Sequence, residues 1–180
     1  MKSHDLAMDG LDQGLFTVRM SRLIQYLTFA TALGCGLSAG VFFAFSSFVM
    51  PALDRLAPAQ SIRAMNSINK LALTPVFMTA LIGTAVACGV LGVWAVVSWG
   101  ERPAVLVLAG SALYLVGAIV VTRAANVPLN DALMTVDPDG AGAAGRWSSY
   151  LADWTAWNHA RAVTTLAASG LLIAALRVSP

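Results

Sequence analysis

The chain is 180 residues long, and 58% of its residues are hydrophobic whereas only 11% are charged. Soluble domains carry about 25% charged residues, so the composition excludes a water-soluble globule of this size. The formal net charge is +2, the basic residues are scattered singly, and the sequence contains no glycine-rich phosphate loop. This pattern excludes a nucleic-acid partner and favours the lipid bilayer as the surroundings of the chain.

Three long segments without a charged residue identify membrane spans. They are residues 23–53, 71–100 and 103–122, and roughly 20 apolar residues suffice to cross a bilayer. An apolar run after Arg161 supplies a fourth span. The sequence therefore predicts an all-α fold, an integral membrane four-helix bundle in one domain of residues 22–178. The expected spans are about 23–50, 75–99, 103–122 and 147–176.

Residues 1–21 precede the first span and are expected to form a flexible N-terminal leader. Asp5, Asp9 and Asp12 interrupt this segment. No small-residue cleavage site follows a short apolar core, so the segment is not typical of a signal peptide.

The first span contains small residues at every fourth position. This spacing predicts a groove in which a neighbouring helix approaches closely, and Pro51 is expected to end or kink the helix. The residues that form the expected groove are Ala32, Gly36, Gly40 and Ala44.

The connection between the first two spans, residues 51–74, is more polar. Pro58 suits the first turn of a helix, and Ile62, Met65 and Asn69 then recur at helical spacing. We expect a short interfacial helix here, with Asn69 on its apolar side. A buried amide needs a hydrogen-bond partner, and this partner is equally well a ligand or another side chain.

Polar residues also mark the end of the third span. Arg123, Asn126 and Asn130 lie at the expected membrane boundary, and Pro128 disfavours a helical conformation at Val127. We expect the helix to break there and Asn126 to cap a short new helix.

The fourth span begins with a stripe of aromatic and polar side chains. Spacings of three and four residues place them on one helical face, and His159 lies one residue round from that face. An interface belt of Trp and Tyr, with the arginine reaching towards the headgroups, is an alternative explanation, but it does not require an asparagine and a histidine beside the arginine. The stripe consists of Trp147, Tyr150, Leu151, Trp154, Asn158 and Arg161.

Four spans place both termini on one side of the membrane and the polar clusters on the other. The basic residues are nearly balanced between the two sides, so the positive-inside rule does not decide the orientation. We set Arg123 and Arg161 aside as expected site residues, and then expect cytoplasmic termini in a bacterial inner membrane.

Four sequence blocks together resemble the anthrone oxygenase-like family of integral membrane proteins, most of whose bacterial members are uncharacterised. The blocks are GLSAGVFFAFSSFVMPAL, SINK, RAANVPLND and WTAWNHARAV, and they follow one another in family order. The resemblance implies oxidation of anthrones to anthraquinones by O₂ without a classical cofactor. The positions that it singles out are Phe45, Ser46, Pro51, Asn69, Asn126, Pro128, Asn130, Trp154, Trp157, Asn158, His159 and Arg161.

The chemistry of an anthrone defines what such a site needs. The benzylic CH₂ is acidic, and loss of its proton leaves an electron-rich, phenolate-like anion that can pass an electron to O₂. His159 is the candidate base, and Arg161, together with Asn158, Asn126 or Asn69, is the candidate group that holds the oxyanion. The substrate-binding candidates are Phe42, Phe45, Trp154 and Trp157 for an apolar slot, and Ser46, Asn69, Asn126 and Asn130 for polar contacts.

We expect no metal and no cofactor. His159 is the one histidine of the membrane region, whose apolar parts contain no carboxylate and no paired cysteines, so no full ligand set for a first-row metal is expected. Haem on this single histidine stays an alternative that a visible absorption spectrum would test. The competing function is a non-enzymatic bundle that binds or carries a small apolar molecule, or that scaffolds a membrane partner. Association with further copies of the chain is left open.

Overall fold

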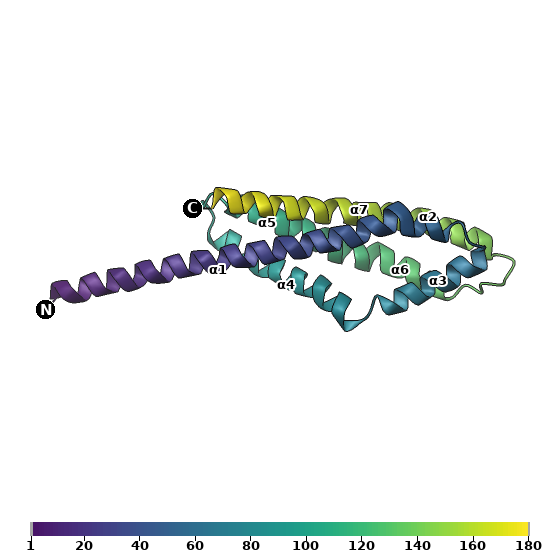
Figure 1. The fold of residues 1–180 in the computed structure, drawn as a ribbon, viewed down its shortest axis with the longest axis horizontal. Coiled ribbons are helices and arrows are strands. Elements are labelled where there is room, and N and C mark those ends of the chain that lie inside the picture. Colours follow the sequence, from purple (N-terminus) through teal and green to yellow (C-terminus); the bar gives the residue numbers. More distant parts are fainter. Residues whose placement is uncertain (1, 180) are drawn as a thin grey trace.

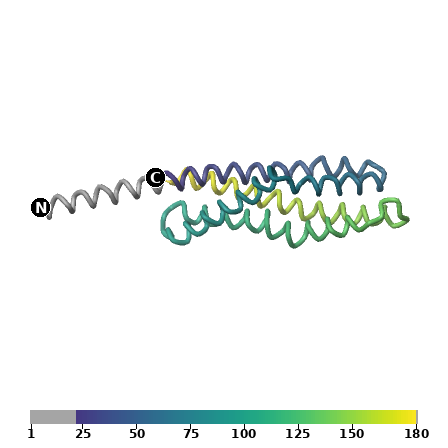
Figure 2. The backbone as a smooth tube through the Cα atoms, turned by 90° about the horizontal axis from the view of Figure 1, so that it is seen from below, coloured from purple at the N-terminus to yellow at the C-terminus, as the bar shows by residue number. Residues whose placement is uncertain are grey.

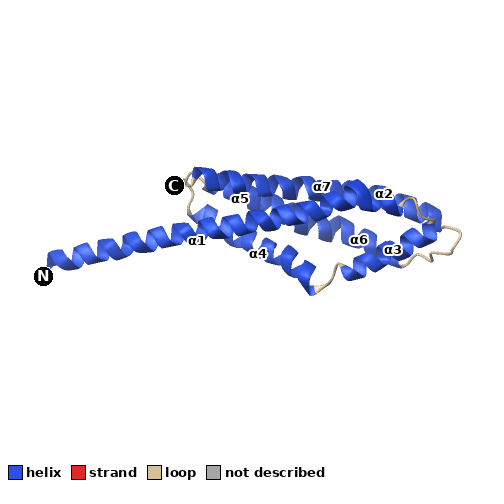
Figure 3. Cartoon of the chain, in the orientation of Figure 1, coloured by secondary structure: helices blue, strands red, loops and turns tan. Residues whose placement is uncertain are grey.

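The computed structural model describes the backbone of residues 2–179 and the side chains of residues 22–179, so the side chains of the expected leader at 1–21 lie outside the described part. The described part contains helices and loops and no strand, which confirms the predicted all-α membrane bundle (Figures 1 and 3). Four stretches are long and apolar enough to cross a membrane, namely Arg22–Leu53, Pro75–Val97, Ala104–Met134 and Ala143–Val178. The elements are α1 (Lys2–Ala44), η1 (Phe45–Val49), α2 (Met50–Leu53), α3 (Pro58–Leu71), α4 (Pro75–Val97), α5 (Ala104–Tyr114), η2 (Leu115–Asn126), α6 (Val127–Met134) and α7 (Ala143–Val178), where η denotes a π-helical stretch.

Helix α7 is the centre of the bundle. It packs along α1 on one side and along α5 and η2 on the other, and α4 packs against α1 and α5. The C-terminal end of α7 lies beside the turns of α1 that follow the leader (Figure 2). The four spans therefore alternate in direction, and the connections through α3 and between α6 and α7 lie together at the opposite end (Figure 1).

Helix–helix contact is tightest at glycines. A Cβ atom on Gly117 would lie 1.9 Å from Thr164 Oγ1, and a Cβ on Gly34 would lie 2.2 Å from Thr84 Oγ1. The groove expected at Ala32, Gly36, Gly40 and Ala44 is only partly present, because nothing lies within 4 Å of a Cβ on Gly40. Close approach in α1 is instead made at Gly34.

The four spans differ in length, and this difference creates a second core. Helix α4 has 23 residues and is about 35 Å long, close to the roughly 30 Å hydrocarbon thickness of a bilayer. The other three spans have 31 to 36 residues, so they continue beyond α4 at the end where α3 lies. A separate apolar cluster fills this region between α2, α3, α6 and α7. It includes Met50, Leu53, Ile62, Met65, Leu133, Trp147, Tyr150 and Trp154.

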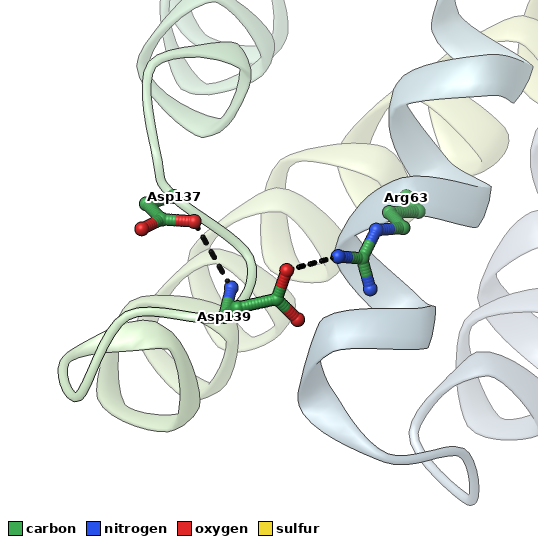
Figure 4. A network of polar contacts seen from close by, with 3 residues as sticks. All are labelled: Arg63, Asp137 and Asp139. Atoms are coloured by element: carbon green, nitrogen blue, oxygen red, sulfur yellow. Dashed lines mark hydrogen bonds and ion pairs between the residues drawn. The ribbon is translucent and has the colours of Figure 1, made fainter.

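Polar contacts join α3 and its neighbours around this second core. Trp147 Nε1 donates to Asp54 Oδ1 at 3.1 Å, and Ser61 Oγ donates to the Leu53 carbonyl at 2.7 Å. Arg63 on α3 forms an ion pair with Asp139 in the loop before α7 (Figure 4). The side chains of Arg63 and Asp139 are each more than half exposed, so this ion pair contributes about 0–1 kcal/mol to the free energy of unfolding. The apolar cluster, rather than this ion pair, holds α3 over the bundle.

The helix break predicted at Pro128 does not occur. Asn126 has helical dihedral angles (φ −68°, ψ −39°) and makes no side-chain cap bond, and the chain continues from η2 into α6. The Val127 N–H bonds the carbonyl of Thr122, five residues back, so the wider π turn precedes the proline. The first span shows the same arrangement, with η1 directly before Met50 and Pro51. Wide turns of this kind let a helix absorb a proline, and they occur frequently at functional sites.

Replacing Gly117 by Ala is expected to destabilise the bundle. The new methyl group would overlap Thr164, and overpacking of this kind costs about 1–3 kcal/mol. The matched substitution Gly40→Ala adds the same methyl group where nothing lies within 4 Å. Thermal unfolding of both variants in the same lipid nanodisc, followed by circular dichroism, should show a lower midpoint for Gly117→Ala alone. Equal midpoints would contradict the close packing of η2 against α7.

Candidate functional site

A cavity of about 310 Å³ lies where α4 begins and α3 covers the bundle. This volume falls at the lower end of the range of small-molecule sites, about 300–1,000 Å³. The wall draws on α1, η1, α3, α4, η2, α6 and α7, so every span contributes. Most of the wall is apolar. The ring-bearing residues that line it are Phe42, Phe45, Phe77 and Trp154, and the polar ones are Asn69, Thr122, Arg123, Asn126, Asn130, Asn158 and Arg161.

Arg161 is the most unusual residue of the wall. It is only 7% exposed, and its guanidinium carbon lies 3.8 Å from the centre of the Phe42 ring. Its one hydrogen bond to a side chain runs from Nη1 to Asn158 Oδ1 at 3.4 Å. No carboxylate pairs with it among residues 22–179, and none of the residues described as lining the cavity is Asp or Glu. A buried charge without a counter-ion is costly, so the cavity is suited to an anion.

Asn158 holds the position of Arg161 and joins two spans. It is fully buried, and its Nδ2 donates to the Phe42 carbonyl and to Ser46 Oγ, both at 2.7 Å. Its Oδ1 faces the guanidinium of Arg161. The same amide therefore fixes α7 against the end of α1 and the start of η1. Ser46 belongs to the support behind the wall rather than to the cavity lining.

A row of rings forms one side of the cavity and continues away from it. Phe45 on η1 and Trp154 on α7 lie 5.7 Å apart between ring centres. Tyr150 follows at 6.3 Å from Trp154, and Trp147 at 5.8 Å from Tyr150. Tilted ring pairs at such separations attract one another beyond simple burial. Phe45 and Trp154, the two rings of this row that line the cavity, give it an apolar aromatic side.

The amide side chains of the wall leave hydrogen-bonding capacity for a ligand. Asn126 Nδ2 donates to the Trp154 carbonyl at 3.3 Å, and Asn130 Oδ1 accepts from the Tyr150 hydroxyl at 2.9 Å. Four enclosed atoms of the cavity wall have no hydrogen-bond partner within the described residues, although the amide of Asn69 lies close to the Tyr150 hydroxyl. Buried polar groups without partners cost about 1–3 kcal/mol each, and such groups gather around this cavity. They are Asn69 Nδ2, Asn126 Oδ1, Trp154 Nε1 and Arg161 Nε.

The structure brings most of the expected site residues together at the cavity and leaves three outside its lining, of which Ser46 lies directly behind the wall. His159 and Trp157 are exposed and do not line the cavity. Successive residues of a helix turn by about 100°, so one step past Asn158 carries His159 off the buried face. The expected placement of a histidine base and of a second tryptophan wall is thus not observed. The expected residues that do line the cavity are Phe42, Phe45, Asn69, Asn126, Asn130, Trp154, Asn158 and Arg161.

Arg123 and Phe77 are two of the lining residues that the expected catalytic and substrate-binding sets omitted. Arg123 was set aside as an expected site residue but was given no binding or catalytic role, although it precedes Asn126 by three positions and shares its side of the helix. Phe77 sits in the almost uniformly apolar helix α4, where no periodicity distinguishes a cavity wall from a lipid-facing surface.

Removing the amide of Asn158 should loosen the join between α1 and α7. Asn158→Ala leaves the Phe42 carbonyl and Ser46 Oγ without their donor, and a loss of about 1–3 kcal/mol in the free energy of unfolding is expected. Ser46→Ala removes one of these bonds and should cost less. His159→Ala changes an exposed side chain, and we expect a change below about 0.5 kcal/mol. Chemical denaturation in one detergent would rank the three variants, and equal losses would contradict the assigned contacts.

A family model described as anthrone oxygenase matches residues 75–171, more than half of the chain. The matched region contains two of the four signature blocks, RAANVPLND and WTAWNHARAV, and therefore most of the polar residues of the cavity. No curated protein and no solved structure matches the chain.

Proposed function

We propose that this chain, which belongs to the anthrone oxygenase family, is a membrane-embedded oxygenase that acts on a flat phenolic or anthrone-like substrate. The observation that carries the proposal is a buried, unpaired arginine in the wall of an apolar, ring-lined cavity. Binding of a neutral apolar molecule does not require such a charge. An anion held on Arg161, with its rings against Phe45 and Trp154, accounts for both parts of the wall.

The role of Arg161 is to stabilise the substrate as its anion. An anthrone that has lost its benzylic proton carries negative charge on a phenolate-like oxygen, and the guanidinium offers N–H donors to this oxygen. Such preorganised electrostatic stabilisation is the largest single contribution in many enzymes. Asn158 positions Arg161 through its Oδ1, and the burial of Arg161 leaves its guanidinium little contact with water, which strengthens the interaction.

The proton can leave without a protein base. His159 is exposed, and none of the residues described as lining the cavity is His, Asp or Glu. The substrate is already acidic, and the cavity lies near the level where hydrocarbon gives way to headgroups. We therefore assign proton release to water at this boundary, with the anion then held by Arg161.

The oxidation step is balanced with O₂ as the one oxidant. The anion passes one electron to O₂, and the carbon radical and superoxide combine to form a C–O bond. The resulting peroxide takes up a proton and loses one molecule of water as the second C–H bond breaks, which leaves the quinone carbonyl. One anthrone and one O₂ thus yield one anthraquinone and one H₂O. No step requires an electron from a cofactor.

Replacing Arg161 tests this role. Purified protein in nanodiscs, supplied with 1,8-dihydroxyanthrone under air, should form quinone faster than protein-free nanodiscs. Arg161→Gln should lower kcat by about 10²–10³-fold, the effect of removing one oxyanion donor, whereas Arg161→Lys should retain part of the rate. Quinone absorbance and O₂ consumption measure the reaction.

Two further variants separate this assignment from the alternatives. Arg146 is an exposed arginine that does not line the cavity, and Arg146→Gln should leave the rate unchanged. His159→Ala should also retain activity, and a large loss would instead support a histidine base. If the wild-type protein binds the anthrone tightly without accelerating quinone formation, the second candidate function, a carrier of small apolar molecules that uses the same cavity, is favoured.

The proposed setting is a bacterial inner membrane with cytoplasmic termini, so the cavity lies near the opposite face. The length and apolar composition of the four spans support a multi-pass membrane protein. The orientation rests on setting Arg123 and Arg161 aside as site residues, because both line the cavity. Fusions of alkaline phosphatase and of green fluorescent protein to the C-terminus would test it, since each reporter is active on one side of the membrane only.

A further inference from the structure

Arg123 on η2 is a second cation in the wall of the cavity, and the proposed reaction does not use it. Unlike Arg161 it is exposed, so it stands at the rim of the cavity rather than at its back. It makes no ion pair and no hydrogen bond among the described residues. The cavity thus has two arginines, one enclosed and one at the rim, and the wall described here provides no acidic side chain to either.

The position of Arg123 along the third span places this rim near the membrane surface. The span begins at Ala104 beside the short turn from α4, and 20 residues run from there to Arg123. In α-helical geometry they would rise about 28 Å, and the wider π turns from Leu115 shorten this length slightly. The hydrocarbon core of a bilayer is roughly 30 Å thick. The guanidinium of Arg123 therefore lies where hydrocarbon gives way to headgroups, at the level where α4 begins.

The cavity opens beside Arg123 between α4 and η2. Helix α4 packs closely against α5 but diverges from η2 towards the α3 end (Figure 1). Exposed apolar side chains line the cavity on this side, among them Leu73 in the turn before α4 and Ile82 in the first half of α4. A molecule dissolved at the edge of the bilayer thus meets an apolar opening with a cation at its headgroup-facing corner.

We propose that Arg123 is an anion subsite that selects flat aromatic substrates carrying a second acid group, foremost a carboxylate. The rings lie in the slot beside Phe45 and Trp154, the reacting oxygen is held by Arg161, and the carboxylate stays at the wet rim on Arg123. The planar guanidinium pairs with a carboxylate through two parallel N–H···O bonds. This inference rests on the proposed function for the reacting end of the substrate, but the subsite itself is a binding property.

The binding experiment uses ligands that do not react with O₂. Equilibrium dialysis of the full chain in zwitterionic nanodiscs, corrected with protein-free nanodiscs, would compare anthraquinone-2-carboxylate with its shape-matched neutral carboxamide at pH 7. Wild-type protein should bind the carboxylate about tenfold more tightly, the lower end expected for a hydrogen bond to a charged group. Arg123→Gln should abolish this preference, and Arg123→Lys should restore part of it.

Controls identify which arginine is responsible. Arg146→Gln removes an exposed charge at the same end of the bundle but outside this cavity, and it should keep the preference. A preference that persists in Arg123→Gln and disappears in Arg161→Gln would place the carboxylate on the enclosed arginine and overturn the proposal. So would equal affinity of the wild-type protein for the two ligands. Each variant is first shown to keep the wild-type unfolding midpoint, so that misfolding is not mistaken for lost selectivity.

The two proposals fail separately in these measurements. A carboxylate preference that depends on Arg123, found in a protein that does not accelerate quinone formation, keeps the subsite and removes the oxygenase function. Accelerated quinone formation without any carboxylate preference keeps the oxygenase function and removes the subsite.

Discussion

The burial of Arg161 without a counter-ion is the constraint around which the site is built. The charge is held by one long hydrogen bond to Asn158 and by the face of the Phe42 ring. Neither contact neutralises it, and a cation–π contact contributes only about 0.5–2 kcal/mol. Such an arrangement survives because the packing around it is strong. Asn158 makes two short bonds to the end of α1 and the start of η1, so the residue that orients the charge also joins two spans.

The region beyond α4 makes this arrangement possible. Three long spans continue past the fourth, and α3 closes over them with its own apolar cluster. The cavity lies between the two apolar clusters of the bundle, with the membrane spans on one side and α3 on the other. Both π-helical stretches end beside this junction, each directly before an X–Pro pair. The wider turns change which side chains reach the cavity, and both spans remain continuous helices. A break at either proline would have interrupted its span.

The sequence predicted the fold class and most of the polar residues of the cavity wall, and the reasons for its failures are physical. Charge-free stretches identify membrane spans because charge is so costly in hydrocarbon, and polar residues on α7 identify a buried face for the same reason. Periodicity placed Asn158 and Arg161 correctly but did not exclude His159, which is one residue away. The expected break at Pro128 was wrong because the π turn before this residue accommodates the proline ring. We recognise no residue pattern in this segment that indicates a π turn. Phe77 was missed because α4 is apolar all round, so its cavity side and its lipid side look alike.

The shortness of α4 has a consequence for the membrane in which the protein works. When the length of a span differs from the thickness of the bilayer, the bilayer becomes thinner or thicker, or the helix tilts. Because α4 alone matches the hydrocarbon core, its two ends fix the depth of the whole bundle, and the opening beside it moves with them. Lipids with longer acyl chains would submerge that opening and those with shorter chains would lift it into water. Acyl-chain length would thereby govern how readily an amphiphile reaches the arginines.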